Sequence, residues 1–238
     1  MNDVELSERL AAVRGAEERL LRTLDALDDH ALRRPSLLPR WTRGHVLAHV
    51  ALNAHSLVNL FTWARTGVET PQYPSWEERD GAIERHSGRT AAEHRAALIE
   101  ASTAFTGAAR AVPAERWDHE VSGIGGSPQP ARTFLFGRLR EVEIHHVDLH
   151  AGYGPRDWSG DFVRAVLGEV PGRLTAGAGE PFVAVATDLG MRLEIGGNAA
   201  AREVSGPGAE LLAWLLGRSA GDGLSASGGA LPAVPPWG

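Results

Sequence analysis

Two short segments hold the side chains of this sequence that could bind a metal ion, 41-WTRGHVLAHVALNAHS-56 and 138-RLREVEIHHVDLHAGY-153. His45 and His49 are four residues apart in the first, and Glu141 and His145 have the same spacing in the second. Residues four apart share one face of a helix. Imidazole and carboxylate groups on facing helices can hold a divalent metal with three protein ligands and one open position. The two segments therefore predict a metal site between two helices.

The spacing alone leaves the ligand set open. His49 lies in an apolar run that favours the bundle interior, where a lone histidine is more often a hydrogen-bonded core residue than a ligand. His45 is one turn nearer the helix start and fits the rim of the bundle. The spacing of Glu141 and His145 also occurs in ordinary surface contacts, although the apolar neighbours of Glu141 make an unpaired carboxylate costly there. Asp148 could orient a ligand imidazole or bind the end of its own helix.

Four long amphipathic segments carry or surround these side chains and predict a four-helix bundle. They cover residues 4–29, 42–66, 90–111 and 131–149, with Thr42 as the N-cap of the second helix and Gly67 as its stop. Residues 67–89 interrupt the bundle with a long excursion that contains one short helix. Long loops in compact domains are often functional, so we expect this excursion to form a wall of the active site.

The pattern changes after Tyr153. A helix over 158–176 is followed by short strands at 181–188, 191–197 and 201–206, by a helix over 207–218 and by a Gly/Ser/Pro-rich tail. The predicted fold class is α+β with two domains, a four-helix bundle over residues 1–155 and a small α+β domain with a short sheet over 156–238.

The composition of the chain excludes several classes of function. The net charge is −6, and the 24 Lys and Arg residues are scattered, so no basic stripe for nucleic acid is present. The N-terminus lacks the apolar core of a signal peptide, and no stretch has the ~18 apolar residues of a membrane span. We therefore expect a cytoplasmic protein, a monomer or weak homodimer that binds small molecules.

The chain has no cysteine, which excludes disulfides, a cysteine nucleophile and thiolate ligands, so any thiol must come from a small molecule.

Three stretches give the sequence a family resemblance. The stretch from Leu37 to Glu69, with AHVA around His49, resembles the N-terminal domain of mycothiol-dependent maleylpyruvate isomerases, which belong to the DinB-like metal-binding four-helix bundles. REVEIHHVDL at 140–149 resembles the RExxxHxxDL helix of that family. LLGRSAGDG at 215–223 and the terminal LPAVPPW resemble its C-terminal α+β domain more weakly. The resemblance covers nearly the whole chain in the expected domain order.

The resemblance implies which residues carry the function. The zinc ligands of the family fall on His49, Glu141 and His145, which favours His49 over His45. The arginine of the C-terminal GR motif, which binds the thiol cofactor or supports activity, falls on Arg218. This chain departs from the family at His146, which could replace His145 as a ligand if the helix were rotated by one position.

The chemistry that the resemblance implies is the cis–trans isomerisation of maleylpyruvate to fumarylpyruvate in gentisate breakdown, with mycothiol as the thiol. A thiolate that adds to the alkene leaves a single bond that can rotate, and elimination then restores the double bond in the trans form. Zinc is expected to bind the thiol and lower its pKa.

The two carboxylates of such a substrate require cations, because guanidinium binds carboxylate in a bidentate way. Arg43, Arg138, Arg140 and Arg218 are the candidates, and Arg138 and Arg218 are the candidates for binding the cofactor. The alternatives are a mycothiol S-transferase, a thiol-dependent isomerase of another unsaturated acid, a metal-dependent hydrolase, and a non-enzymatic bundle.

Overall fold

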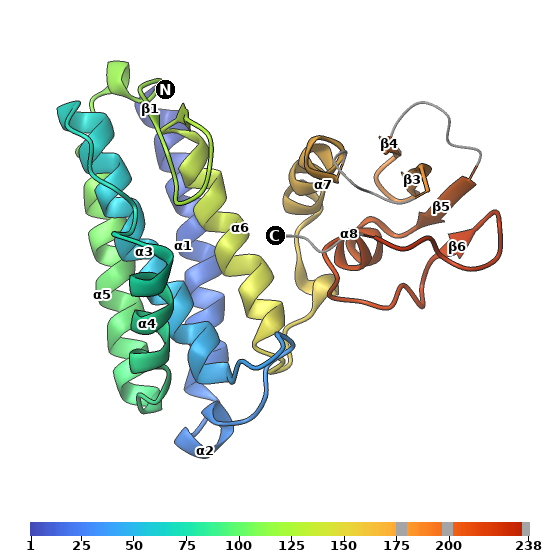
Figure 1. The fold of residues 1–238 in the computed structure, drawn as a ribbon, viewed down its shortest axis with the longest axis horizontal. Helices are drawn as coiled ribbons and strands as arrows, with labels where there is room; N and C mark the ends of the chain where they lie inside the picture. The colour runs from blue at the N-terminus through green and yellow to red at the C-terminus, as the bar shows by residue number, and fades with distance from the viewer. Residues whose placement is uncertain (175–179, 197–201, 235–238) are drawn as a thin grey trace. The chain divides into compact units, whose positions relative to one another are not determined.

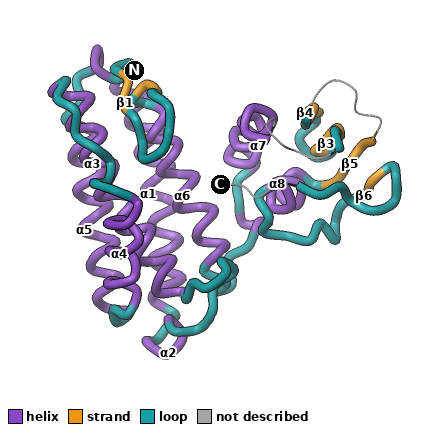
Figure 2. Tube along the Cα trace, viewed as in Figure 1, coloured by secondary structure: helices purple, strands orange, loops and turns teal. Residues whose placement is uncertain are grey.

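The computed structural model divides the chain into two units, Met1–Tyr153 and Gly154–Gly238. It describes residues 1–174, 180–196 and 202–234. The first unit is a helical bundle and the second combines helices with a small sheet (Figures 1 and 2). The predicted fold class is thereby confirmed. Among the described residues, no helix is both long enough and apolar enough to cross a membrane.

Four long helices form the first unit: α1 (Asp3–Asp25), α3 (Arg43–Thr66), α5 (Ala91–Arg110) and α6 (Thr133–Asp148). They close a ring, because α1 contacts α5 and α6, and α3 contacts the same two helices. Their apolar stripes meet in one core that includes Leu20, Leu47, Phe61, Phe105 and Leu135. Burial of these faces removes apolar surface from water and holds the helices together.

The helix that carries His49 begins and ends where the sequence predicts. The Thr42 side chain accepts a hydrogen bond from the backbone N–H of His45, and the His45 side chain accepts one from the backbone N–H of Thr42. This reciprocal pair satisfies N–H groups that lack a partner inside the helix. Gly67 ends α3 in the left-handed conformation, with φ at 77°, a conformation that costs glycine little.

Each connection between the long helices carries a short element of its own. A single turn, α2 (Asp29–Leu32), follows α1. The predicted excursion carries α4 (Trp76–Ser87), which packs against α3. Between α5 and α6 lie a short helix, η1 (Ala114–Arg116), and a two-stranded hairpin, β1 (Glu120–Val121) with β2 (Gln129–Pro130). The excursion is therefore mostly helical, and it covers part of the helix that carries His49.

The second unit begins with a 3-10 turn, η2 (Pro155–Asp157), and α7 (Gly160–Leu174). Three predicted strands are present as β3 (Phe182–Ala186), β4 (Met191–Ile195) and β5 (Arg202–Gly206), and β6 (Ser225–Ala226) adds an unpredicted strand in the C-terminal tail. The strand order is β4-β3-β5-β6, with β3 and β5 parallel and the other two pairs antiparallel. Helix α8 (Gly208–Leu215) contacts β3 and β5, and α7 contacts β4.

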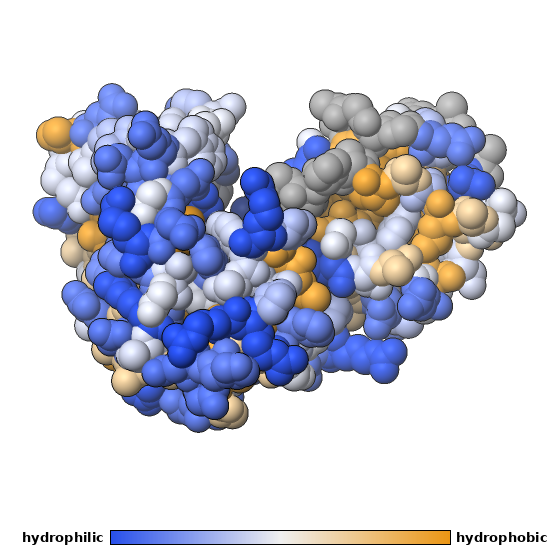
Figure 3. Space-filling view, turned by 60° about the horizontal axis from the view of Figure 1, so that its bottom comes forward, coloured by the Kyte–Doolittle hydropathy of each residue, from blue (hydrophilic) through white to orange (hydrophobic). Residues whose placement is uncertain are grey.

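One face of the helical unit shows no single large hydrophobic patch (Figure 3). The face drawn in Figure 3 is mostly hydrophilic over the helical unit, with hydrophobic residues scattered among the polar ones.

Candidate metal centre

Helices α3 and α6 bring the three predicted ligands together. Nε2 of His49 lies 3.0 Å from Oε2 of Glu141 and 3.0 Å from Nε2 of His145. Nε2 of His145 lies 3.5 Å from the same carboxylate oxygen. Among the described residues, these three side chains form a group whose ligand atoms all lie within 4.8 Å of one another. Two nitrogens and one oxygen thus converge on a single point between the two helices.

The site is buried at one ligand and open at another. His49 is 5% exposed, whereas the side chain of Glu141 is 30% exposed. A centre with three protein ligands and an accessible side is typical of catalytic zinc sites, which keep a position for water or substrate. Imidazole and carboxylate are ligands that zinc accepts, and their types fit such an ion here.

A fourth residue fixes the orientation of His145. Nδ1 of His145 lies 2.9 Å from Oδ2 of Asp148, whose side chain is fully buried. With Nδ1 engaged by the carboxylate, Nε2 is the nitrogen directed at His49 and Glu141. Metal-binding histidines commonly have such a partner at their other nitrogen, which fixes the tautomer and the ring.

The pKa values of the two histidines are shifted in opposite directions. Burial and the positive charge of His145 together lower the pKa of His49 to about 4, although Glu141 opposes the shift. Burial also opposes the charged form of His145, but hydrogen bonds and charges from Asp148 and Glu141 outweigh it and raise that pKa to about 9. Burial alone would raise the pKa of Glu141, but both histidines hold it well below its usual value. Without a metal, one positive charge therefore resides on His145 at neutral pH.

Two other histidines of these segments, His45 and His146, have partners away from the three ligands. Nδ1 of His45 takes part in the cap of α3, and its Nε2 lies 3.0 Å from Glu84. His146 is buried, with Nε2 2.7 Å from the Thr23 hydroxyl and its ring stacked on Tyr153 at 3.7 Å between centroids. Its position toward α1 removes His146 as the alternative to His145.

Two of the arginines that were candidates for binding the substrate or the cofactor lie inside the bundle. Arg138 is fully buried, and its guanidinium binds Glu17, the carbonyl of Val50 and the side chain of Asn53. These internal partners correct the expectation that Arg138 contacts the cofactor or a substrate carboxylate, because the buried group has no access to either. Arg43 is 7% exposed and donates to carbonyl groups after the end of α6. Arg140 is partly exposed on α6.

Arg218 belongs to the second unit. It follows Gly217, which has a φ of 73°, just after α8. Its Nη1 donates to the carbonyl of Leu216 at 2.6 Å. Part of the side chain therefore caps the end of its own helix, as cationic residues at helix C-termini often do.

Sequence reasoning missed two residues that touch His49. Nη2 of Arg79 lies 3.4 Å from Nδ1 of His49, and the Trp41 ring lies 5.6 Å from the His49 ring between centroids. Arg79 belongs to α4, so its place at the site depends on how α4 packs against α3. The only signal in the sequence was the expectation that residues 67–89 form a wall of the site.

A pocket lies beside His49. It is lined by Arg40, Trp41, His45, Arg79, Asp80, Ile83 and Glu84 and has a volume of roughly 420 Å³. Trp41 and Arg79 belong both to this pocket and to the surroundings of His49. The pocket thus places an aromatic ring and a guanidinium next to the candidate metal centre.

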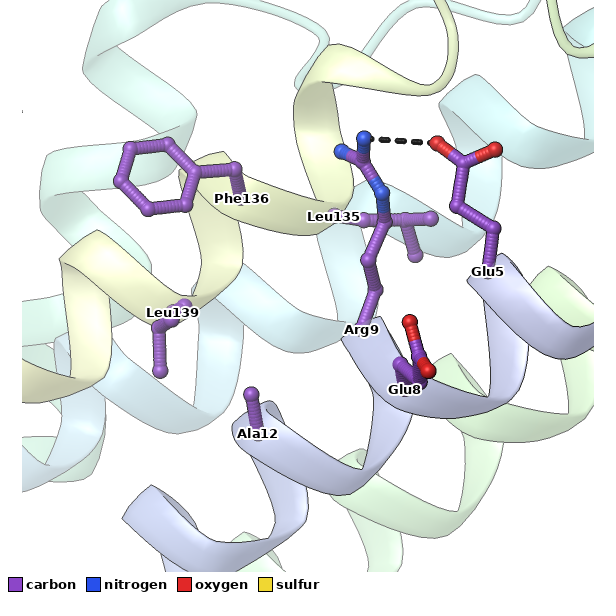
Figure 4. A pocket seen from close by; sticks show the side chains of 7 residues that line it. All are labelled: Glu5, Glu8, Arg9, Ala12, Leu135, Phe136 and Leu139. Carbon is purple, nitrogen blue, oxygen red and sulfur yellow. Dashed lines mark hydrogen bonds and ion pairs between the residues drawn. The ribbon is translucent and has the colours of Figure 1, made fainter. Parts of the chain in front are cut away.

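A second pocket of the bundle offers no comparable chemistry. It lies between α1 and α6 and is lined by Glu5, Glu8, Arg9, Ala12, Leu135, Phe136 and Leu139 (Figure 4). Its charged groups include a partly exposed Arg9–Glu5 pair at 2.8 Å, and its α6 side is apolar. The pocket contains none of the three converging ligands.

Comparison with known proteins agrees with the residues of the site. The sequence model described as "Mycothiol maleylpyruvate isomerase N-terminal domain" matches residues 13–150, which include all three candidate ligands. The chain belongs to the mycothiol-dependent maleylpyruvate isomerase family. Family membership confirms the predicted resemblance, and the members are isomerases that depend on a small-molecule thiol.

Solved structures extend the similarity to both units. In sequence, the chain is 34% identical to the protein in the crystal structure of the mycothiol-dependent maleylpyruvate isomerase. The two structures superpose with a TM-score of 0.91, and the match covers 98% of this chain and 97% of that chain. A histidine-to-alanine mutant of the isomerase gives the same values. No curated protein matches the sequence. The family assignment therefore rests on the domain match and on similarity along nearly the full chain.

Proposed function

We propose that this chain isomerises maleylpyruvate to fumarylpyruvate with mycothiol as cofactor, and that His49, Glu141 and His145 hold the divalent metal that this reaction uses. The observation that carries the proposal is the convergence of two imidazole nitrogens and one carboxylate oxygen within 4.8 Å, in a chain of this family. Zinc is the metal we propose, because two nitrogens and one oxygen with an open position make a ligand set that catalytic zinc accepts.

In this proposal the two histidines bind the metal in their neutral form, and Asp148 orients one of them. A bound divalent metal lowers the pKa of a coordinated thiol, so that a thiolate is available at neutral pH. His49 and His145 must both be neutral to act as ligands. His49 meets that condition at neutral pH because its pKa is about 4. His145 must release a proton, and Asp148 then holds its Nδ1–H and keeps Nε2 directed at the site.

The chain contributes no sulfur of its own, since none of its 238 residues is cysteine. Reversible addition to a conjugated cis double bond requires a nucleophile that is also a good leaving group, and thiolates satisfy both conditions. The dependence on an external thiol in the family name is consistent with this composition.

Arg79 is our candidate for binding a substrate carboxylate. Its guanidinium lies beside His49, and its Nη1 lies 2.6 Å from a carboxylate oxygen of the largely exposed Asp80. The centre of the Trp76 ring lies 5.5 Å from Cζ of Arg79. An exposed ion pair contributes little, so a substrate carboxylate can replace Asp80 at small cost. We propose Arg79 for this role in place of Arg43 and Arg138, two of the four arginines that the sequence suggested.

Arg218 is proposed, from the family resemblance, to bind the thiol cofactor or support its reaction. Arg218→Ala is expected to lower mycothiol-dependent turnover while the protein retains its metal. Loss of metal together with turnover would instead assign Arg218 a structural role.

The decisive experiment measures maleylpyruvate turnover by the metal-loaded protein with and without mycothiol. Turnover is expected only when mycothiol is present. Equal turnover without any thiol would reject the proposed reaction and favour attack by a metal-activated water, as in a hydrolase.

A further inference from the structure

Two arginines link α3 and α6 on either side of the candidate metal centre. The two helices run antiparallel, since Arg43 at the start of α3 meets the end of α6, and Val50 meets Arg138 further back along α6. The metal ligands lie between these two contacts. Each arginine donates from one helix to a backbone carbonyl of the other, so the links have opposite directions.

The first link is built on Arg138. Its Nη1 donates to the Val50 carbonyl at 2.8 Å and to Oδ1 of Asn53 at 3.0 Å. Its Nε and Nη2 donate to Oε1 of Glu17 at 3.1 and 2.8 Å. The second carboxylate oxygen of Glu17 accepts from the Ser102 hydroxyl of α5. The Arg138 guanidinium and the Glu17 carboxylate together thus connect all four long helices of the bundle.

The second link is built on Arg43. Its Nε donates to the carbonyl of Leu149 at 2.9 Å, and its Nη2 donates to that of His150. The last carbonyls of a helix have no partner inside the helix and carry partial negative charge, which a buried guanidinium satisfies. The backbone of α6 is therefore fixed to the start of α3 just after the ligand His145.

Each link binds the backbone close to a ligand residue. Val50 follows His49 directly in the chain. The backbone N–H of Leu149, the residue whose carbonyl binds Arg43, donates to the carbonyl of His145 at 3.0 Å. A shift of either helix along its axis would break these contacts and move one ligand relative to the others.

We infer that Arg43 and Arg138 are positioning residues for the metal centre, and that they set the spacing and register of α3 and α6 at which His49, Glu141 and His145 converge. The inference rests on the proposed metal site and adds to it the two residues that hold α3 and α6 in position. Metal sites require ligands to be held within about 0.5 Å of the productive geometry, and hydrophobic side chains alone allow more adjustment than directed hydrogen bonds to carbonyl groups.

The test measures metal binding and not activity. Apo protein is titrated with Co²⁺, and the affinity and visible absorption of the bound ion are recorded beside the unfolding midpoint. Arg43→Met and Arg138→Lys remove one link each; lysine keeps the charge opposite Glu17 but lacks the planar fork that reaches three partners. We expect each variant to bind Co²⁺ about 10–100-fold more weakly, with an altered absorption spectrum.

Two further variants separate positioning from stability. Glu17→Gln with Arg138→Met replaces the buried ion pair by neutral side chains of similar size, which preserves folding in many proteins, and it should still bind Co²⁺ weakly. Phe105→Leu is the matched control, because Phe105 is fully buried, packs on Phe61 and makes none of the hydrogen bonds of the two links. It should lower the unfolding midpoint and leave Co²⁺ affinity within twofold of the wild type.

The outcomes distinguish this inference from the proposed function. Wild-type affinity and spectrum in folded Arg43→Met and Arg138→Lys would overturn the inference while the metal site stands. A loss of affinity in Phe105→Leu as large as in the link variants would also overturn it, since general destabilisation would then explain the effect. A wild-type protein that binds no Co²⁺ would overturn the metal site and this inference together.

Discussion

Nδ1 of His145 lies 2.9 Å from Oδ2 of Asp148, one helical turn later in α6. Because the Asp148 side chain is fully buried, the contact is shielded from water and fixes which nitrogen of His145 faces the other ligands. The same carboxylate raises the pKa of His145, so it also determines how strongly protons compete with a metal for this side chain.

Asp148→Asn keeps the shape of the side chain but removes its charge. Above pH 9, where His145 is neutral in both proteins and protons no longer compete with the metal, we expect metal affinity to fall by about 10–100-fold, because an amide no longer favours the imidazole orientation that the carboxylate enforces. Competition with a chelator of known affinity measures the change. The exposed cap Asp28→Asn serves as control and should retain wild-type affinity; equal affinity in Asp148→Asn would exclude an orienting role.

His49→Ala is expected to yield a folded protein with little bound metal and no turnover, because two ligands from one helix cannot complete the site. His45→Ala is the matched control on the same helix, since His45 contacts Glu84 and the N-cap instead of the ligands. Metal analysis of both purified variants distinguishes them. Full metal content in His49→Ala would contradict the ligand assignment.

Metal binding should release about one proton per site at pH 7. His145 is protonated below its pKa of about 9 and must lose that proton, whereas His49 is already neutral above about 4. Metal affinity should therefore rise about tenfold per pH unit as pH increases towards 9, and level off above it. Calorimetry in buffers of different ionisation enthalpy counts the protons. Release of no proton at pH 7 would show that His145 is neutral in the apo protein.

Arg79→Ala should raise KM for maleylpyruvate by about tenfold or more, since it removes a charge-assisted contact to a carboxylate, with metal content unchanged. Steady-state kinetics on the metal-loaded protein measure the effect. Arg85→Ala changes the same charge on an exposed position of the same helix and should leave KM unaltered. A normal KM in Arg79→Ala would assign carboxylate binding to another residue.

Gly44→Ala tests the contact between α3 and α4 that brings Arg79 to the site. A Cβ atom at Gly44 would lie 2.1 Å from the Ser87 carbonyl, so α4 must move or the protein loses about 1–3 kcal/mol of stability. Gly88→Ala is the matched control, because its added Cβ meets nothing within 4 Å. Thermal unfolding should separate the two variants, and equal midpoints would show that α4 adjusts without cost.

The elements of the bundle could be predicted from local signals. The period of apolar residues located α3, α5 and α6, and Thr42 and Gly67 defined the limits of α3 because capping depends on neighbouring residues. The strand β6 was missed, since two residues in a Gly/Ser-rich tail have no periodic pattern, and their extended shape comes from pairing with β5.

The sequence by itself determined the ligand types, their spacing and the helices that carry them, because these depend on residues a few positions apart. Tertiary structure decided which histidine faces Glu141, and it placed Arg79 beside His49 and Arg138 inside the bundle. Such contacts join residues far apart in the chain, so they follow from how the helices pack and not from any local pattern. The arginines look alike in sequence, and only burial and partners distinguish one that holds helices together from one at the site.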